Sequence, residues 1–257
     1  MPLDELRDVR VAKRKKLRDA GVDPYPARSS RTHRIADALA GFDALMRDKT
    51  EIVLAGRLTA LREHGGSVFA DMNDGSGVIQ VYLKKDLLGA EPYQLFLDAV
   101  DIGDFLESSG ALFVTKKNEK TLEAHDFSVL TKSLLPLPEK WHGLQDVEER
   151  FRKRYLDINF NDKVKEKFLA RFRVLDLLRK FFRDNDYLEV ETPILQPLPG
   201  GATARPFKTH MNDLNVDLYL RVAPELYLKR LLVGGFERVF EIGKNFRNEG
   251  MDKEHNP

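Results

Sequence analysis

The chain has 257 residues, of which 42 are basic and 41 acidic, and its net charge of +1 does not by itself indicate a polyanionic partner. It contains no cysteine, which excludes disulfides, thiolate nucleophiles and cysteine-ligated zinc. No apolar run is long enough to span a membrane, and the first residues lack the apolar segment of a signal peptide. We therefore expect a soluble, cytoplasmic protein with two domains, each large enough to bury a core.

The first 34 residues carry a local positive charge, with ten basic and five acidic residues and the run KRKK at positions 13–16. Apolar residues recur there at helical spacing up to Gly21, where a helix would end, and Pro24 and Pro26 follow. The pattern predicts a basic helix, an extended linker and a short helical stretch over residues 35–47. Such a basic run is either a nucleic-acid contact or, more often, a solvated helix face.

From residue 51 the apolar pattern changes to a period of two. Three strand-like runs occupy residues 51–85 and are separated by the turn sequences EHGGS and NDGSG. A helical stretch over 91–100 divides them from two further strands, near 104–117 and 120–132. This order predicts a five-stranded β-barrel of the OB type, although a different small barrel would also fit.

Prolines in LLPLPEKWHGLQD, residues 134–146, predict a domain boundary. One long amphipathic helix is predicted after it, with Asn161 as its N-cap and its end by Asn185. Its apolar stripe consists of Val164, Phe168, Phe172, Leu175, Leu178 and Phe182.

The stretch YLEVETPIL, residues 187–195, predicts a strand closed by Pro193, which cannot donate a backbone hydrogen bond. PLPGGATARPF follows as a glycine-rich loop and APELYLKRLLVGGF as a helix. A final strand is predicted from Phe240, and because side chains alternate along a strand, one of its faces is polar and the other apolar. The polar face holds Glu241, Gly243, Asn245, Arg247 and Glu249, and the apolar face holds Phe240, Ile242 and Phe246.

Several of these segments, taken in series, resemble the class II lysyl-tRNA synthetases. YLEVETP is similar to motif 1 of that class, a helix and strand that end in a proline at the dimer interface, here Pro193. FRNEG is similar to the first half of motif 2, and VETPIL, PGGATARPF, LYLRVAPELYLKRLLVGGFERVFEIGKNFRNEG and HNP follow the order of the family. LPLPEKWHG and GLQDVEERFRKRYLD match as well, so the resemblance covers essentially all 257 residues. A lone F-R-x-E would be a weak signal, whereas these signatures together are specific.

The resemblance implies an α+β protein in which an OB barrel binds the anticodon and the start of an antiparallel-sheet catalytic domain follows, ending within motif 2. The expected organisation is a basic helix and linker over 1–48, the OB domain over 49–135, a linker over 136–150 and the partial catalytic domain over 151–257.

In this family the carboxylate of lysine attacks the α-phosphate of ATP to give lysyl-adenylate and pyrophosphate, and the lysyl group then passes to the terminal ribose of tRNA. No covalent enzyme intermediate is needed, so catalysis depends on positioning and on stabilising charge at phosphorus, for which a planar guanidinium is well suited. By the resemblance, Arg247 bridges the substrate carboxylate and the α-phosphate, and Glu249 lies near ATP and the amino acid.

Four further residues receive substrate-binding roles by the resemblance. Glu225 of APEL corresponds to the residue that holds the α-amino group of lysine, and Gly201 of PGGA would let backbone approach the same ligand. His255 and Asn256 fall in the loop that folds over the nucleotide. The alternative readings are surface charges, a turn glycine and a helix-terminal glutamate.

OB folds bind single strands by stacking bases on aromatic side chains. The resemblance assigns the stacking ring to Phe69 and the amide that reads a uridine edge to Gln80. An acidic partner is expected from the fifth strand, and Glu119 is assigned, with Glu123 as the alternative because NEKTLE departs from the usual Gly-Glu-Leu pattern. If Phe69 were instead a core residue, this assignment would fail. The basic first helix would add phosphate contacts.

The partners implied are tRNA(Lys), ATP, L-lysine, Mg²⁺ and, for the full-length protein, a second copy. The carboxylates that hold Mg²⁺ and those that read the ε-ammonium of lysine are expected outside this chain, so no metal ligand is assigned. We expect an enzyme whose 257-residue piece alone has little adenylation activity.

Three other functions fit parts of the sequence. An aspartyl- or asparaginyl-tRNA synthetase shares the barrel and both motifs, but GGATARPF and APELYLKRL favour lysine. A lysyl-type ligase that modifies a translation factor lacks the barrel. A non-catalytic RNA-binding protein derived from a synthetase would keep the barrel and only part of the catalytic domain.

Overall fold

The computed structural model describes residues 2–137 and 146–251. The chain divides into two compact units, Met1–Gln145 (unit 1) and Asp146–Pro257 (unit 2), and the division falls inside the linker predicted over 136–150. Within the described residues, no helix combines the length and the apolar character needed to cross a membrane.

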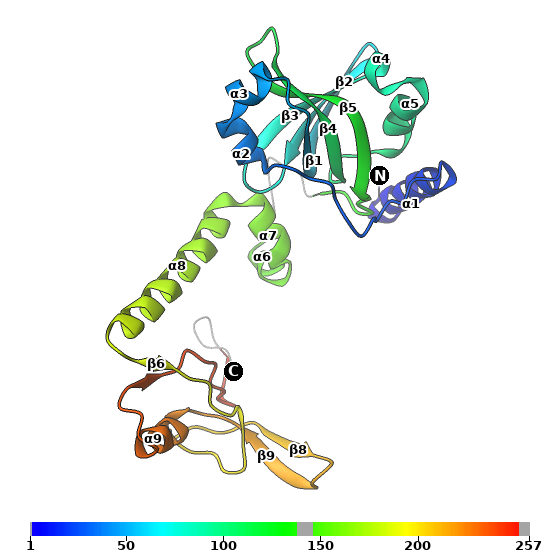
Figure 1. The fold of residues 1–257 in the computed structure, drawn as a ribbon. Coiled ribbons are helices and arrows are strands. Elements are labelled where there is room, and N and C mark those ends of the chain that lie inside the picture. The colour runs from blue at the N-terminus through cyan, green and yellow to red at the C-terminus, as the bar shows by residue number, and fades with distance from the viewer. Residues whose placement is uncertain (1, 138–145, 252–257) are drawn as a thin grey trace. The chain divides into compact units, whose positions relative to one another are not determined.

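Unit 1 is built around a closed barrel (Figure 1). Its strands pair in the order β1-β2-β3-β5-β4, with β3 and β5 parallel and the other neighbours antiparallel. The α+β class and the OB-type barrel predicted from the sequence are confirmed. The strands are β1 (Ile52–His64), β2 (Ser67–Asn73), β3 (Val78–Lys84), β4 (Phe105–Val114) and β5 (Lys120–Thr131).

The core of unit 1 lies inside this barrel, because the apolar residues of each strand recur every second position. In β2, Val68, Ala70 and Met72 are buried, whereas Phe69 and Asp71 lie between them on the outer face. At Gly110 the strands β4 and β5 approach so closely that a Cβ would overlap the carbonyl oxygen of Glu123, and the register shifts there. A glycine is therefore required where the barrel bends.

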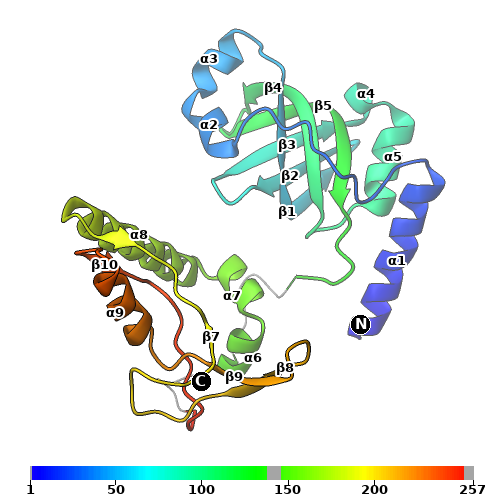
Figure 2. The ribbon, with the colours of Figure 1, turned by 60° about the horizontal axis from the view of Figure 1, so that its bottom comes forward.

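Two pairs of short helices lie on opposite sides of the barrel (Figure 2). They are α2 (Ile35–Ala40) with α3 (Phe42–Arg47), and α4 (Lys85–Leu88) with α5 (Ala90–Ala99). The helical stretch predicted over 35–47 is thus interrupted at Gly41. The predicted turn NDGSG, which is distant in sequence, caps the N-terminus of α2. The backbone N–H of Ile35 donates to Asp74 Oδ2 at 2.9 Å, and that of Ala36 donates to Ser76 Oγ at 3.1 Å.

The predicted basic helix is α1 (Leu3–Asp19), and a buried ion network joins it to the end of β5. The Lys132 ammonium is fully buried and donates to Asp104 at 2.7 Å and to Asp101 at 2.6 Å. The other carboxylate oxygen of Asp101 accepts from Lys13 of α1, also at 2.6 Å. Leu17 of α1 is completely buried in the same core.

Unit 2 begins with two short helices that lie beside the start of one long helix (Figures 1 and 2). The long helix, α8 (Asp162–Asp184), follows the prediction, but the side chain of Asn161 at its N-cap position makes no capping hydrogen bond. The short helices α6 (Val147–Arg152) and α7 (Arg154–Phe160) were not predicted. A fourth helix, α9 (Glu225–Val233), lies within the helix predicted over 223–236.

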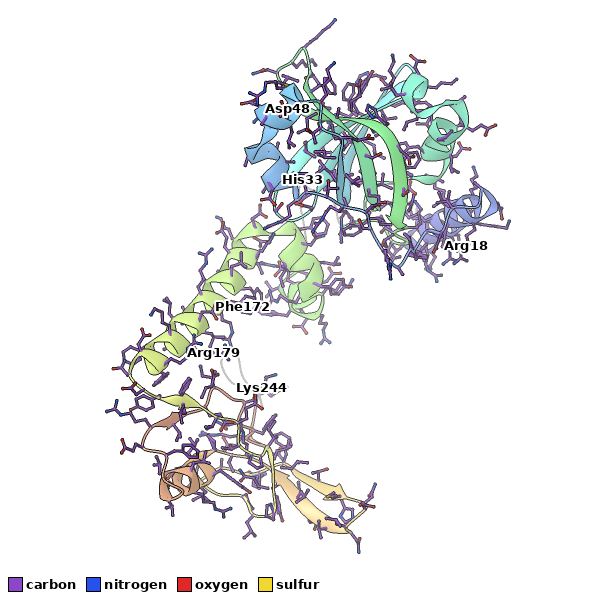
Figure 3. All side chains as sticks on the ribbon, viewed as in Figure 1. Arg18, His33, Asp48, Phe172, Arg179 and Lys244 are labelled. Carbon is purple, nitrogen blue, oxygen red and sulfur yellow. The ribbon has the colours of Figure 1, made fainter. Side chains whose placement is uncertain are left out.

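The apolar stripe predicted for α8 is only partly covered in the described part of unit 2. Val164 is buried, whereas Phe172, labelled in Figure 3, is 55% exposed and Leu178 is 43% exposed. At the end of the helix, the ring of Phe182 stacks on Phe240 at 4.5 Å.

The strands of unit 2 are short and form two small sheets. The single strand predicted over 187–195 is wrong, because β6 pairs in parallel with β10 in one sheet while β7 pairs with β9 in the other. Pro193, which has no N–H to donate, lies between β6 and β7. A hairpin of β8 and β9 was not predicted. The strands are β6 (Leu188–Glu189), β7 (Leu195–Gln196), β8 (Lys208–Met211), β9 (Val216–Leu220) and β10 (Val239–Phe240).

Candidate functional site

A row of aromatic rings lies on the outer face of the barrel in unit 1. Phe69 of β2 stacks on Tyr82 of β3, with ring centroids 4.7 Å apart and planes 29° apart. Phe113 of β4 continues the row at 6.0 Å from Tyr82. Phe69 is therefore not a core residue, because both of its chain neighbours point inward while its ring is partly exposed.

Polar side chains lie beside the rings on the same face. Gln80 accepts a hydrogen bond at its Oε1 from Thr121 Oγ1 at 3.0 Å, and its Nε2 has no partner among the described residues. In the register of β2 and β3, Gln80 faces Asp71, which accepts two hydrogen bonds from Arg62 at 3.0 and 2.5 Å. The hydrogen bond with Asp71 raises the pKa of Arg62, and the charge of Glu119 raises it further.

The two acidic candidates occupy different positions. Glu119 lies one residue before β5, and its backbone closes a turn with Thr115. Glu123 lies on β5 directly opposite Tyr82 of β3. Phe69, Gln80 and both acidic candidates therefore belong to one end of the barrel surface, and Arg62 is the charged neighbour that sequence reasoning missed.

The basic run of α1 is mostly occupied by contacts within unit 1. Lys13 pairs with Asp101 at 2.6 Å, Lys15 with Asp19 at 2.6 Å and Lys16 with Asp98 at 3.6 Å. These pairs explain the run KRKK largely as a structural feature of the helix.

In unit 2, the glycine-rich loop packs onto the start of α9. Gly201 has a φ of +87°, which glycine adopts without strain, and a Cβ there would lie 3.2 Å from the Cβ atoms of both Ala223 and Glu225. Glu225 is the first residue of α9, is exposed, and pairs with Lys229 at 2.6 Å. The structure thus brings together Gly201 and Glu225, two of the residues expected to contact lysine.

The predicted motif 2 strand stops early. Only Val239–Phe240 of the described segment forms a strand, and the backbone from 241 to 248 is irregular, so the regular alternation predicted for it is wrong. Arg247 and Glu249 are exposed, and neither side chain has a hydrogen bond or ion pair within residues 146–251. His255 and Asn256 lie outside the described residues.

A buried arginine that the sequence did not reveal lies behind this segment. Arg221 is 2% exposed, and its guanidinium donates to the Lys244 carbonyl at 2.9 Å, to Thr192 Oγ1 at 2.9 Å and to Glu241. Its backbone donates to the Ile194 carbonyl at 2.8 Å. Arg221 therefore joins the end of motif 1 to the start of motif 2; Lys244 is labelled in Figure 3.

The position of Glu241, the carboxylate partner of Arg221, explains why the polar strand face predicted for residues 241–249 does not form. Glu241 is buried rather than projecting with Arg247, and although desolvation raises its pKa, hydrogen bonds from Thr192 and Arg221 lower the pKa overall. A Cβ at Gly243 would overlap the guanidinium of Arg221, so any larger residue at this position would displace that guanidinium from its buried hydrogen bonds. The only sequence signal was an arginine directly after an apolar strand.

No cluster of three or more His, Asp or Glu side chains suited to a metal ion occurs among the described residues. Mg²⁺ is often bound through only one or two carboxylates together with substrate phosphates, so this observation identifies no ligand of the ion among the described residues.

Each of the two units matches a known protein family, and the whole chain is similar to known proteins. Residues 52–130 match the family of OB-fold nucleic acid binding domains, and residues 146–257 match the tRNA synthetases of class II (D, K and N). The lysine–tRNA ligase of Roseiflexus castenholzii is 52% identical over 258 residues, which cover 100% of this chain and 53% of that protein. The ligase of Carboxydothermus hydrogenoformans is 51% identical over 255 residues, covering 99% and 52%, and that of Methanoculleus marisnigri is 51% identical over 250 residues, covering 96% and 49%.

An OB barrel followed by this domain defines a class II aminoacyl-tRNA synthetase of the D, K and N group. Within that group, the chain belongs to the lysyl-tRNA synthetase family. The chain spans about half the length of the curated relatives it matches.

Proposed function

We propose that this chain acts in the ATP-dependent activation of lysine to lysyl-adenylate and in its transfer to tRNA(Lys). The observation that carries the proposal is the close packing of Gly201 against Glu225, because a Cβ atom added to Gly201 would lie 3.2 Å from the Cβ atom of Glu225. This packing occurs in a chain that is 52% identical to a lysine–tRNA ligase. The glycine lets the loop backbone pack closely against the start of α9, beside Glu225, whose carboxylate suits the α-ammonium group of an amino acid.

Arg247 and Glu249 complete the proposed catalytic group. Both are exposed and free of partners within the described residues, so their side chains are available to ATP and to the substrate carboxylate. A guanidinium can bind a carboxylate and a phosphate at once, and it stabilises the charge that develops at phosphorus. His255 and Asn256 are proposed to contact the nucleotide.

The barrel is proposed to bind the anticodon. Phe69 supplies a partly exposed ring, Gln80 an unpaired amide donor and Glu119 or Glu123 an acceptor on the same surface. Each base stacked on an aromatic ring contributes roughly 1–3 kcal/mol to binding.

The remaining partners are proposals of the same kind. ATP is a substrate, and Mg²⁺ would accompany it with ligands outside the described residues. A second copy is proposed to pack on the motif 1 region, where Pro193 is exposed and α8 presents uncovered apolar side chains. We place the reaction in the cytoplasm.

The test uses a chimera of these 257 residues with the C-terminal remainder of the Roseiflexus castenholzii lysine–tRNA ligase. We expect lysine-dependent exchange between ATP and pyrophosphate, and a loss of about 10²–10³ in kcat for Arg247→Ala because a transition-state donor is removed. Lys244→Ala, in the same segment and exposed, is the matched control and should retain the rate.

Two results would contradict the proposal. If a folded chimera exchanged ATP and pyrophosphate in the presence of aspartate or asparagine but not of lysine, the substrate would be one of those amino acids. A folded chimera that binds tRNA without any exchange would favour a non-catalytic RNA-binding protein.

A further inference from the structure

A cavity between α6, α7 and the first half of α8 combines a positively charged rim with an apolar floor. Its volume is about 400 Å³, and each lining residue that the structure describes belongs to unit 2. None of the lining residues that the structure describes is acidic. The rim and floor include Arg150, Arg154, Lys167, Arg171, Phe151 and Phe168.

The guanidinium groups of Arg150 and Arg154 are both held by the buried carboxylate of Asp157. Arg150 donates to one oxygen of Asp157 at 2.9 Å and Arg154 to the other at 2.5 Å, while Asp157 itself is 3% exposed. Arg154 also lies over the ring of Phe151, 4.5 Å from its centroid. One buried carboxylate thus orients two cations and neutralises only one of their charges.

The other two cations have no such partner. Lys167 and Arg171 lie one turn apart on α8, are exposed, and form no ion pair within the described part of unit 2. The nearby acids of α6 are paired elsewhere, Glu148 with Arg152 at 2.7 Å and Glu149 with Lys153 at 2.7 Å. The cavity therefore keeps a surplus of positive charge.

We propose that this cavity is a second RNA-binding site, which receives the sugar–phosphate backbone of tRNA outside the anticodon. The inference rests on the proposed function. Guanidinium and ammonium groups match phosphate oxygens, and the Phe151 ring, 63% exposed, offers an apolar surface to a ribose or base. A second copy of this chain fits the cavity less well, because a symmetric contact would bring two cationic rims together.

The test compares two double variants of this chain that carry the same change in charge. Lys167→Gln/Arg171→Gln removes the unpaired cations of the cavity, and Lys163→Gln/Arg173→Gln removes one lysine and one arginine from exposed positions of α8 that do not line it. A tRNA(Lys) transcript and its isolated anticodon stem-loop are titrated into each variant by fluorescence anisotropy over a series of KCl concentrations.

We expect the cavity variant to bind the transcript at least about tenfold more weakly and to lower the slope of log affinity against log salt by about 2, because each lost phosphate contact removes close to one released counterion. The control variant should match the unsubstituted chain, and the stem-loop should bind all three equally.

Equal affinities and slopes for the two variants with the transcript would overturn the proposal. The proposal would also be overturned if the cavity variant lost as much affinity for the stem-loop as for the transcript. A change in the sedimentation of the cavity variant without a change in its RNA binding would overturn it too, and would assign the cavity to contact with a second copy. Phe69→Ala separates this inference from the proposed function: if it weakens stem-loop binding while the cavity variant behaves like its control, the barrel assignment stands and the second site does not.

Discussion

At the scale of single residues, one carboxylate supports much of the packing of α1 against the barrel. Asp101 accepts from Lys13 and from the buried Lys132, each at 2.6 Å. Desolvation raises the pKa of Asp101, but the hydrogen bonds from Lys13 and Lys132 outweigh it, so its pKa is lowered overall. A carboxyl group whose pKa is lowered on folding stabilises the protein above its unfolded pKa, and this contribution is lost as the pH falls through the folded value.

We therefore predict that Asp101→Asn destabilises unit 1 by about 1.5–3 kcal/mol at pH 7, the range for hydrogen bonds to charged groups. The difference between variant and unsubstituted chain should shrink as the pH falls below about 4, because Asp101 is then protonated in the unfolded chain and, at lower pH still, in the folded one. Urea unfolding followed by circular dichroism from pH 3 to 7 measures it. A difference that stays constant with pH would show that Asp101 acts through packing alone.

Buried charged residues such as Lys132 and Arg221 are the part of the structure that the sequence could not predict. Phe69 could be placed on the barrel surface as one of two alternatives, because its neighbours alternate with it in a regular strand. Lys132 and Arg221 could not be predicted as buried, because a charged residue at the end of a strand usually faces solvent. Their partners are distant in sequence, such as Thr192 and Glu241 for Arg221, and no local pattern encodes that pairing.

At the scale of elements, the motif 2 segment shows how tertiary contacts override a strand pattern. The N–H of Phe246 donates to the Arg221 carbonyl at 3.0 Å and that of Asn248 to the Arg205 carbonyl at 2.8 Å. The segment is thus held by two unconnected partners rather than by one continuous strand, and a regular pleat does not form. By contrast, the barrel strands were predictable because each has long neighbours on both sides.

The contacts of Arg221 lead to a prediction for this element. Arg221→Met should destabilise unit 2 by about 3–5 kcal/mol, because Glu241 is then left buried without its cation. Replacing both partners, as in Arg221→Met/Glu241→Leu, should recover part of the loss, since an apolar pair avoids the unpaired charge. Hydrogen exchange at the Phe246 amide measures the local opening.

The matched control is Arg230→Met on α9, where the guanidinium is exposed and lies over the Tyr227 ring at 4.9 Å. A surface substitution of this kind should change the stability by less than about 1 kcal/mol. Equal effects of Arg221→Met and Arg230→Met would mean that the buried network does not hold motif 2.

At the scale of the whole molecule, the two units differ in how much apolar surface they bury. The contiguous buried cluster lies entirely in unit 1, from Leu17 to Val129. In the described part of unit 2, the buried apolar side chains are Val164, Val222 and Phe240, while Leu177 is 65% and Phe181 60% exposed. Large exposed apolar side chains on one helix are typical of an interface, so we expect the proposed association with a second copy to stabilise unit 2 more than unit 1.

We therefore predict two unfolding transitions for this chain in urea. The transition at lower urea belongs to unit 2, and its midpoint should rise with protein concentration, because association stabilises the folded form by mass action. The transition at higher urea should not depend on concentration, and a chain of residues 1–145 should reproduce it, since unit 1 contains its own core. A single transition, lost together with unit 2 in the shorter chain, would show instead that the barrel depends on unit 2 for its stability.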